Sequence, residues 1–291
     1  MRIEKPIIIV GTGRSGTTIF YKILSQHKDV VWLSSLLSKF PEKLWIERYF
    51  HTLVKLPILG YLLKKRYPPT ETYTFWNHYY KGFATPIRDL TSDDVTLKVK
   101  ADIRSAFEKI LGGGKKRLVI KITGWPRIGF LKEIFPDAKF INVIRDGRAV
   151  AYSLMNVPWW WGWRGPQNWR FGELPQNLKL KWEKYDRSFI ALAAIEWMIL
   201  MDAFEKAKQY IQKDNYLEIK YEDLCANPIE VFKKILEFAE LKYPKDFIKT
   251  IRQFDLKNKN YKWQIELTEY QKEILNDILK DYLVKYRYCV S

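Results

Sequence analysis

The segment Ile7-Ile-Ile-Val-Gly-Thr-Gly-Arg-Ser-Gly-Thr-Thr18 predicts the fold of this chain. Its first four residues are all β-branched, which is typical of a short strand buried in a parallel sheet. Glycines follow at once, and from Thr17 to about Gln26 the apolar residues recur with helical spacing. A glycine-rich turn between such a strand and a helix is where α/β proteins hold phosphate groups, because backbone amides and the helix N-terminus both favour an anion.

The spacing of this turn overlaps the nucleotide-binding P-loop, with Gly11 and Gly16 at the two glycine positions. A P-loop that hydrolyses ATP or GTP has a lysine after the second glycine, which contacts the β- and γ-phosphates. Thr17 stands at that position here, and the cation of the loop is Arg14. The loop therefore argues against a nucleotide hydrolase. By itself it is also compatible with a glycine-rich turn that binds no ligand.

Outward from this segment, short apolar runs alternate with helical patterns. The further expected strands are 30–33, 118–122, 139–144 and 216–219. Strands that alternate with helices predict a parallel sheet covered by helices on both faces. We therefore expect an α/β fold, in which a P-loop-like parallel sheet is flanked by helices and carries helical insertions.

We expect residues 1–291 to form a single α/β domain with helical insertions, since no linker composition or internal repeat divides the chain. Two stretches fit the alternation poorly: a helical and aromatic insertion at about 36–110, and a loop rich in Trp, Gly and Pro at about 156–178. That loop is too long for a plain connector, and such loops are often lids or binding loops. A long helical pattern then runs from about Leu178 to Ile211.

A second anion-binding pattern follows the expected strand 139–144. In Arg145-Asp-Gly-Arg-Ala-Val-Ala-Tyr-Ser153, Arg145 ends the strand and Ser153 lies two turns into the next helix. A guanidinium fork and a hydroxyl placed in this way can approach one anion beside the helix start. Alone, the pattern also fits a capped helix with a surface arginine. Two anion cradles on adjacent strands suit one nucleoside with phosphates at two ends.

The composition limits the classes of partner. The 291 residues carry a formal net charge of +17, but the lysines and arginines are scattered, as on a solvated surface. No finger, RNP pattern or recognition helix points to a nucleic-acid partner. No apolar run reaches the roughly 20 residues of a membrane span, although the apolar and basic stretch Leu53–Lys65 leaves contact with a membrane surface open.

The cysteine content helps to predict the cellular compartment. Cys225 and Cys289 are far apart in the chain and fit neither a metal motif nor a disulfide framework. We therefore expect a cytoplasmic protein, with a peripheral position at the membrane surface as the alternative.

Taken together, these motifs resemble the sulfotransferases that use 3′-phosphoadenosine 5′-phosphosulfate (PAPS). The resemblance is to the branch with an arginine in the first loop, which includes the tyrosylprotein sulfotransferases and many prokaryotic enzymes. Gly11–Thr18 is similar to the family's 5′-phosphosulfate loop, and Phe135–Ser153 is similar to its 3′-phosphate strand and helix. Tyr221–Leu224 and Asn260–Trp263 match two further family elements in the same order.

The resemblance implies a role for each matched position. The 5′-phosphosulfate would be held by Gly13, Arg14, Ser15, Gly16, Thr17 and Thr18, and the 3′-phosphate by Arg145 and Ser153. Tyr221 would lie near the adenine, and the segment with Asn260, Lys262 and Trp263 would close over the nucleotide. Arg14 and Lys121 would be catalytic, through charge on the leaving phosphate and the sulfuryl oxygens. We expect no metal, because no carboxylate cluster suits magnesium.

The general base is where the chain departs from its relatives. Thr123 stands where some relatives have a histidine two residues after the strand lysine. Ser34 and Ser35 stand near the place where tyrosylprotein sulfotransferases have a glutamate. An acceptor hydroxyl needs a group that takes its proton. His51 and Glu47 in the insertion are the candidates, and packing or surface roles suit both residues as well.

The acceptor is expected beside the tryptophan-rich loop. Trp159, Trp160, Trp161 and Arg164 follow the 3′-phosphate helix, which in this fold class places them at the mouth of the site. Exposed tryptophans can stack on sugars or cover an apolar acceptor, and an arginine can meet an anion. The alternative for this loop is a packed cap on the core.

The predicted function is therefore sulfuryl transfer from PAPS to a hydroxyl or amine, as on a carbohydrate or glycolipid. A P-loop-like kinase or phosphotransferase is one alternative. The other is a non-catalytic protein that binds anionic surfaces through its net charge of +17.

Overall fold

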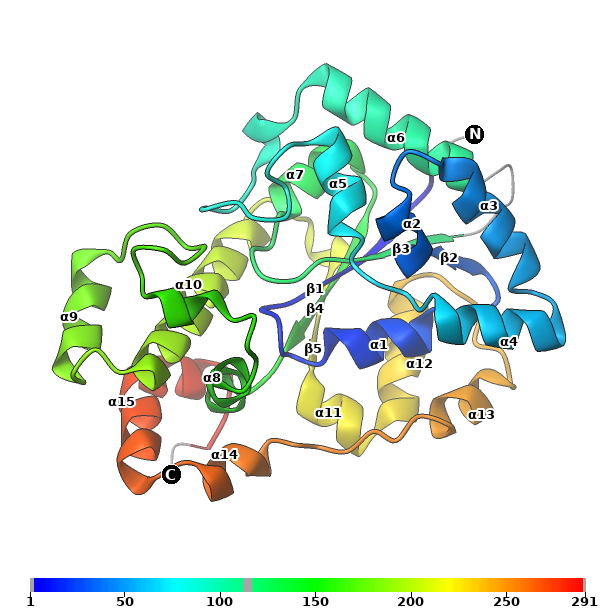
Figure 1. Cartoon of the computed structure of the whole chain (residues 1–291). Coiled ribbons are helices and arrows are strands. Elements are labelled where there is room, and N and C mark those ends of the chain that lie inside the picture. Colours follow the sequence, from blue (N-terminus) through cyan, green and yellow to red (C-terminus); the bar gives the residue numbers. More distant parts are fainter. Residues whose placement is uncertain (1–2, 112–116, 290–291) are drawn as a thin grey trace.

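The protein is described from a computed structural model that covers residues 3–111 and 117–289. Its centre is a five-stranded parallel sheet in the order β2-β3-β1-β4-β5 (Figure 1). The strands are β1 (Ile7–Val10), β2 (Val30–Trp32), β3 (Arg117–Lys121), β4 (Lys139–Ile144) and β5 (Tyr216–Lys220). Helices cover both faces of this sheet, so the predicted α/β class is confirmed.

Successive residues of β1 point to opposite faces of the sheet, and each face has its own hydrophobic core. Ile7 and Ile9 pack with α1 (Thr17–Leu24), α12 (Pro228–Phe238) and α13 (Phe247–Arg252). Ile8 and Val10 pack with α5 (Tyr73–Tyr79), α6 (Leu97–Leu111) and α7 (Ile128–Ile134). The four apolar residues of β1 are therefore shared between two cores, which explains why the run is continuous rather than alternating.

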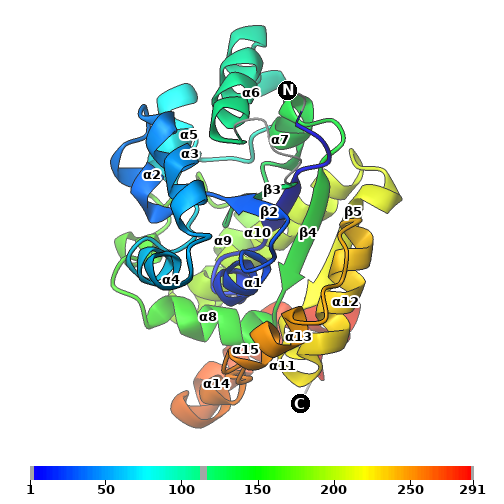
Figure 2. The ribbon, with the colours of Figure 1, turned by 90° about the vertical axis from the view of Figure 1, so that its right-hand side faces the viewer.

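A third hydrophobic cluster lies beyond the carboxyl ends of the strands. It joins α8 (Gly147–Met155), α10 (Phe189–Lys208) and α15 (Glu269–Lys285) with part of the tryptophan-rich loop. Figure 2 shows α8 and α15 close together below the sheet. This cluster holds the helix that carries Ser153 in place against the sheet.

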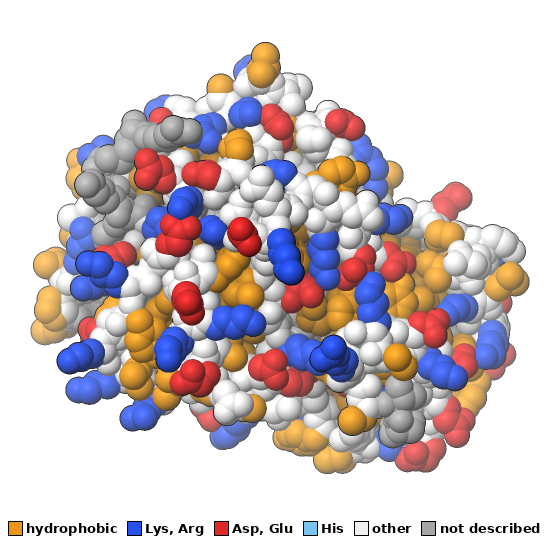
Figure 3. All heavy atoms as spheres, turned by 180° about the vertical axis from the view of Figure 1, so that it is seen from behind, with side chains coloured by type: hydrophobic (Ala, Val, Ile, Leu, Met, Phe, Trp, Pro, Cys, Tyr) orange, Lys and Arg blue, Asp and Glu red, His pale blue; other side chains and the backbone are white. Residues whose placement is uncertain are grey.

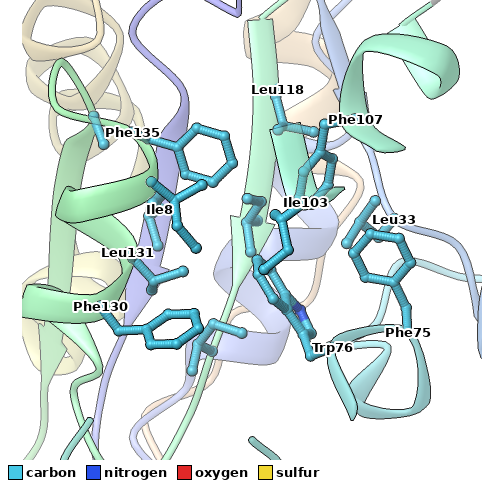
Figure 4. Close-up of a cluster of buried hydrophobic side chains, with 14 of the residues drawn as sticks. Ile8, Leu33, Phe75, Trp76, Ile103, Phe107, Leu118, Phe130, Leu131 and Phe135 are labelled. Atoms are coloured by element: carbon cyan, nitrogen blue, oxygen red, sulfur yellow. The ribbon is translucent and has the colours of Figure 1, made fainter. Parts of the chain in front are cut away.

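The core under α6 and α7 is filled by aromatic rings (Figure 4). Phe107, Phe130 and Phe135 are all fully buried there. Trp76 and Phe83 stack with 4.7 Å between their ring centroids. Because aromatic side chains bury large areas, this packing fastens the inserted helices to the sheet.

The stretch predicted as a helical and aromatic insertion is helical. It contains α2 (Ser35–Lys39), α3 (Leu44–Leu53), α4 (Pro57–Arg66), α5, a 3-10 helix (Ser92–Asp94) and α6. Phe50 of α3 belongs to the core with α1, whereas Phe75 of α5 belongs to the core under α6. The insertion thus contributes to both cores, which supports the proposal that residues 1–291 form one domain.

The long helical pattern predicted from Leu178 to Ile211 is two helices, α9 (Gln176–Lys184) and α10. Asp186 and Arg187 separate them with left-handed backbone angles, φ of 51° and 55°. Apolar spacing alone does not reveal such a break, because the residues on both sides keep a helical period. The remaining helices are α11 (Tyr221–Ala226) and α14 (Tyr261–Glu266), and the tryptophan-rich loop contains a 3-10 turn at Trp161–Arg164. None of the helices within the described residues is long and apolar enough to cross a membrane.

The register of the sheet brings three chain segments to one edge. Val10 of β1 lies opposite Asn142 of β4, and Ile144 at the end of β4 lies opposite Lys220 at the end of β5. The residues that follow these strands therefore meet. This edge is also where the strand order reverses, between β1 and β4, and ligands of open α/β sheets bind at that point.

Candidate functional site

The loop after β1 forms an anion-binding cradle. Gly13 and Arg14 have left-handed backbone angles, φ of 68° and 54°, and Gly16 follows with φ of 89° directly before α1. A side chain at Gly16 is excluded, because its Cβ would lie 2.3 Å from the Tyr221 ring. The Ser15 hydroxyl is fully buried and has no hydrogen-bond partner within the described residues. A buried unpaired donor at a helix start fits a site that an anion completes.

Arg14 and Arg145 lie next to each other beside this cradle. Arg14 Nε donates to Ser153 Oγ at 2.9 Å, and Arg145 Nη1 donates to the Arg14 carbonyl oxygen at 2.8 Å. Arg145 Nε also donates to Asn260 Oδ1 at 2.8 Å. The structure therefore joins Arg14, Arg145 and Ser153, which the sequence assigned to two separate motifs.

The two guanidinium groups are not neutralised. In the part of the chain that the structure describes, neither Arg14 nor Arg145 forms an ion pair with a carboxylate. Burial lowers the pKa of Arg14, and the positive charge of Arg145 lowers it further. Because two adjacent cations repel each other, an anion bound between them is favoured. Guanidinium forks are suited to phosphate groups, which they bind through paired hydrogen bonds.

Tyr221 and Asn260 complete the surroundings of Arg145. The Arg145 guanidinium lies over the Tyr221 ring, 4.6 Å from its centroid. The Tyr221 hydroxyl donates to the Lys257 carbonyl oxygen at 3.0 Å, which ties the ring to the segment before α14. The Asn260 side-chain amide donates to the Glu222 carboxylate while its oxygen accepts from Arg145. Arg145 is thus held from three sides in one orientation.

The two other residues predicted on this segment have different surroundings. Lys262 Nζ lies 3.7 Å from Glu266 Oε1 at the surface. Trp263 is buried, and the Arg148 guanidinium lies 4.6 Å from its ring centroid. Both residues belong to α14, and Trp263 packs this helix against α8.

Lys121 at the end of β3 lies beside the start of α1. Only 2% of its surface is exposed, and its Nζ donates to Thr18 Oγ1 at 2.9 Å. The same Nζ lies 2.7 Å from Glu71 Oε1. Burial lowers the pKa of Lys121, and the charge of Glu71 opposes that shift. One ammonium and one carboxylate are therefore fixed next to the anion cradle.

A cavity of about 360 Å³ opens between the cradle and the tryptophan-rich loop. Gly13 and Arg14 line it on one side, and Glu71 and Tyr73 line it on another. The Tyr73 hydroxyl donates to the Thr123 carbonyl oxygen at 2.9 Å, which fixes that wall. The rest of the lining includes five aromatic residues: Trp125, Trp159, Trp160, Trp161 and Phe171. The cavity can hold an aromatic or sugar-like group with a reacting atom near Glu71 and Arg14.

The three tryptophans predicted at the acceptor site differ in their exposure. Trp159 is 61% exposed, and the Arg14 guanidinium lies 5.9 Å from its ring centroid. Trp161 lies between two guanidinium groups, those of Arg164 at 4.1 Å and Arg170 at 4.2 Å from its centroid. Trp160 is buried in the third hydrophobic cluster and also lines the cavity.

Glu196 of α10 is a buried carboxyl group in the cavity wall. Trp160 Nε1 donates to Glu196 Oε2 at 2.6 Å. Burial raises the pKa of Glu196 to about 7, although the hydrogen bond from Trp160 and the charge of Arg170 oppose the shift. A carboxyl group that titrates near neutrality in a cavity is a functional candidate as well as a cost to stability.

Glu47 and His51, the predicted base candidates, belong to α3 and do not line the cavity. The Glu47 carboxylate accepts hydrogen bonds of 2.6 Å from both the backbone N–H and the hydroxyl of Ser34. His51 Nε2 donates to the Trp32 carbonyl oxygen at 2.7 Å and lies 3.6 Å from Glu47 Oε1. Both side chains are buried, and these contacts join α3 to the end of β2.

Sequence reasoning missed Glu71, Arg170 and Glu196. Glu71 follows Pro68-Pro69 in a stretch with no periodicity, and Lys121 is 50 positions away in the chain. Arg170 lies in the tryptophan-rich loop, and Glu196 interrupts the otherwise apolar face of a helix that was expected to be buried. A charged residue on a buried helix face was the one available signal, because such residues are seldom buried without a function or a partner.

Comparisons with known proteins identify the family of this chain. The model of the sulfotransferase family matches residues 6–245, so the chain belongs to the sulfotransferase family. The fold is similar to that of sulfotransferase STF9 from Mycobacterium avium, with a TM-score of 0.60 and 18% identity over 99% of this chain and 78% of that one. It is also similar to the sulfotransferase domain of the curacin biosynthetic pathway, with a TM-score of 0.55, 12% identity and complete coverage of both chains.

Among characterised relatives, a protein-tyrosine sulfotransferase of Drosophila melanogaster is 25% identical over 112 residues. Protein-tyrosine sulfotransferase A of Caenorhabditis elegans is 23% identical over 112 residues. The matched region is 38% of this chain but only 18% and 24% of the length of those two proteins.

The raised pKa of Glu196 predicts a pH-dependent stability. The unfolded carboxyl titrates near 4.5 and the folded one near 7. Between those values the folded state binds more protons, so the free energy of unfolding falls as the pH rises. Glu196→Gln keeps an acceptor for Trp160 and should be more stable than wild type above neutral pH by about 3 kcal/mol, with no difference below about pH 4.

Urea unfolding of both proteins across this pH range measures the effect. Glu269→Gln is the control, because the Glu269 side chain is 85% exposed and should leave the pH profile unchanged. Parallel stability profiles for wild type and Glu196→Gln would contradict the prediction.

Proposed function

We propose that this sulfotransferase transfers the sulfuryl group of PAPS to a hydroxyl or amine of an acceptor bound in the cavity. The observation that carries the proposal is the pair Arg14 and Arg145, which has no carboxylate partner in the described residues and is linked through the Arg14 carbonyl oxygen. Arg14 lines one cavity together with Glu71, and Glu71 pairs with Lys121.

The donor-binding residues divide into two ends. At one end, Gly13, Ser15, Gly16, Thr17 and Thr18 would surround the 5′-phosphosulfate with backbone N–H groups and hydroxyls. At the other end, Arg145 and Ser153 would hold the 3′-phosphate, with Tyr221 beside the adenine and Asn260, Lys262 and Trp263 closing that side. The unpaired Ser15 hydroxyl and the absence of a counter-ion for Arg145 in the described residues support this division.

Arg14 and Lys121 are the residues that we assign to charge stabilisation. In the transfer, an acceptor oxygen or nitrogen bonds to sulfur while the bond from sulfur to the bridging oxygen breaks, and negative charge grows on the leaving phosphate. From the cradle, the Arg14 side chain would reach the leaving phosphate. Lys121, next to Thr18, faces the sulfuryl oxygens. Both cations are held in place before reaction, so little reorganisation is needed.

Glu71 is the residue that we assign as the general base. Its carboxylate lines the cavity and lies 2.7 Å from Lys121 Nζ, whereas Glu47 and His51 do not line it. A base must lie within hydrogen-bond reach of the acceptor proton. Glu71 takes the proton as the acceptor attacks.

The aromatic wall favours an acceptor with a flat or sugar-like face, and we propose a glycan or glycolipid. Trp159 and Trp161 line the cavity, and the Arg164 guanidinium lies 4.1 Å from the Trp161 ring centroid. Sugars bind on such rings through their apolar faces, while nearby cations suit an acidic substituent.

Arg14→Ala tests the donor assignment. We expect turnover to fall by at least about 100-fold, as on removal of one preorganised donor to a developing negative charge. Calorimetry with 3′-phosphoadenosine 5′-phosphate should show weaker binding as well, and ATP should bind wild type far less tightly. Arg252→Ala, at an exposed position of α13, is the matched control. Near wild-type sulfation by Arg14→Ala, or preference for ATP, would exclude the proposed reaction.

Glu71→Gln tests the base. We expect kcat to fall by about 100-fold or more while donor affinity changes little, because general-base catalysis contributes that much. Glu42→Gln is the control, since the Glu42 side chain is 75% exposed and lies away from the cavity. An active Glu71→Gln protein together with an inactive, folded Glu47→Gln protein would assign the base to Glu47 instead.

Trp159→Ala tests the acceptor wall. Loss of a ring that lines the cavity should raise the acceptor KM by about tenfold and leave donor binding unchanged, since one stacking contact is removed. Trp163→Ala is matched in size and lies in the same loop but outside the cavity wall. Equal acceptor KM values in the two variants would remove Trp159 from the acceptor site.

A further inference from the structure

The outer surface of α3 and α4 exposes an unusual number of large apolar side chains. Of the twenty such exposed side chains among the described residues, eight lie between positions 45 and 62. They are Trp45, Tyr49, Leu53, Leu56, Ile58, Leu59, Tyr61 and Leu62, between 41% and 80% exposed. We call these eight residues the α3–α4 apolar surface. Contiguous apolar surface of this kind marks an interaction site.

The apolar surface results from how the two helices pack. Leu44 and Phe50 face the core from one side of α3, while Trp45, Tyr49 and Leu53 repeat every four residues along its outer side. The outer apolar side chains therefore do not belong to the core, although the Trp45 and Tyr49 rings contact each other.

Helix α4 contributes almost nothing to the core, because Gly60 is its only buried residue. A Cβ at Gly60 would lie 2.2 Å from the Val54 carbonyl oxygen, so α4 lies directly on the end of α3. Figures 1 and 2 show α4 at the outside of the molecule, next to α3. Leu63 also packs against the core with α1, whereas Ile58, Leu59 and Leu62 are exposed.

Positive charge predominates in the segment that carries this apolar surface, and the exposed Glu42 stands directly before it. Residues 43–66 contain six cations, Lys43, Arg48, Lys55, Lys64, Lys65 and Arg66. The single acid of the segment is Glu47, which is 1% exposed and bonded to Ser34. Elsewhere the charges are mixed: Figure 3 shows acidic and basic side chains interspersed over the face seen from behind.

We propose that the α3–α4 apolar surface docks on a bilayer that contains anionic phospholipids. Aromatic residues such as Trp45 and Tyr49 suit the headgroup level, and the apolar side chains of α4 suit the acyl boundary. Lys65 and Arg66 end the helix, where long cationic side chains reach phosphate groups while their stems stay apolar. Charge complementarity favours this partner over a second copy of the chain. Two copies would place the six cations of one surface against the six cations of the other.

Sedimentation with lipid vesicles tests the proposal and requires no sulfuryl transfer, so its outcome is separate from that of the proposed function. Wild type should sediment with vesicles of phosphatidylcholine and phosphatidylserine and much less with phosphatidylcholine alone. Ile58→Asp/Leu62→Asp and Lys65→Glu/Arg66→Glu should each weaken binding by about tenfold or more. Leu97→Asp, at an 87% exposed position of α6, is the matched control and should bind as wild type.

Thermal unfolding confirms that each variant is folded, since all the substituted side chains are exposed. Failure of wild type to bind the anionic vesicles would overturn the proposal, and so would binding that both double variants retain. Light scattering tests whether a second copy of the chain occupies this surface instead. A dimer that Ile58→Asp/Leu62→Asp dissociates, without vesicle binding, would assign the surface to a second copy of the chain and reject the bilayer.

Discussion

The parallel pairing of β4 between β1 and β5 is the constraint on which the site depends. Because Val10 lies opposite Asn142 and Ile144 lies opposite Lys220, the residues after all three strands meet at one edge. A slip of one residue would turn Ile8 from one core to the other, so burial on both faces holds this register. The hydrophobic cores thus determine the distance between Arg14 and Arg145, although neither residue contributes apolar packing.

The same arrangement places unsatisfied polar groups where an anion can use them. Two adjacent guanidiniums without a carboxylate and a buried hydroxyl without a partner each cost stability in the free protein. Such costs are typical of sites that are organised in advance for a charged ligand. Membership of the sulfotransferase family and this electrostatic arrangement point to the same kind of donor.

The helical insertion explains features that the sheet and the loops after its strands do not supply. It delivers Glu71 to Lys121, and it carries the outward-facing α4 a few residues earlier in the chain. Its inner residues, such as Phe50 and Phe75, fasten it to the two cores. Reaction chemistry and docking can therefore vary in this segment while the sheet stays the same.

The sequence by itself determined the strands, the donor loop and the second motif, because burial and backbone preference act over a few neighbouring residues. Strand 139–144 and the start of the helix at Thr17 agree with the structure to the residue. Only the tertiary structure decided that Arg14 bonds to Ser153, that Trp160 is buried against Glu196 and that Glu71 pairs with Lys121. Those contacts join residues that are from 36 to 139 positions apart. Local periodicity carries no information about them, since only the packing of the whole chain sets which distant side chains meet.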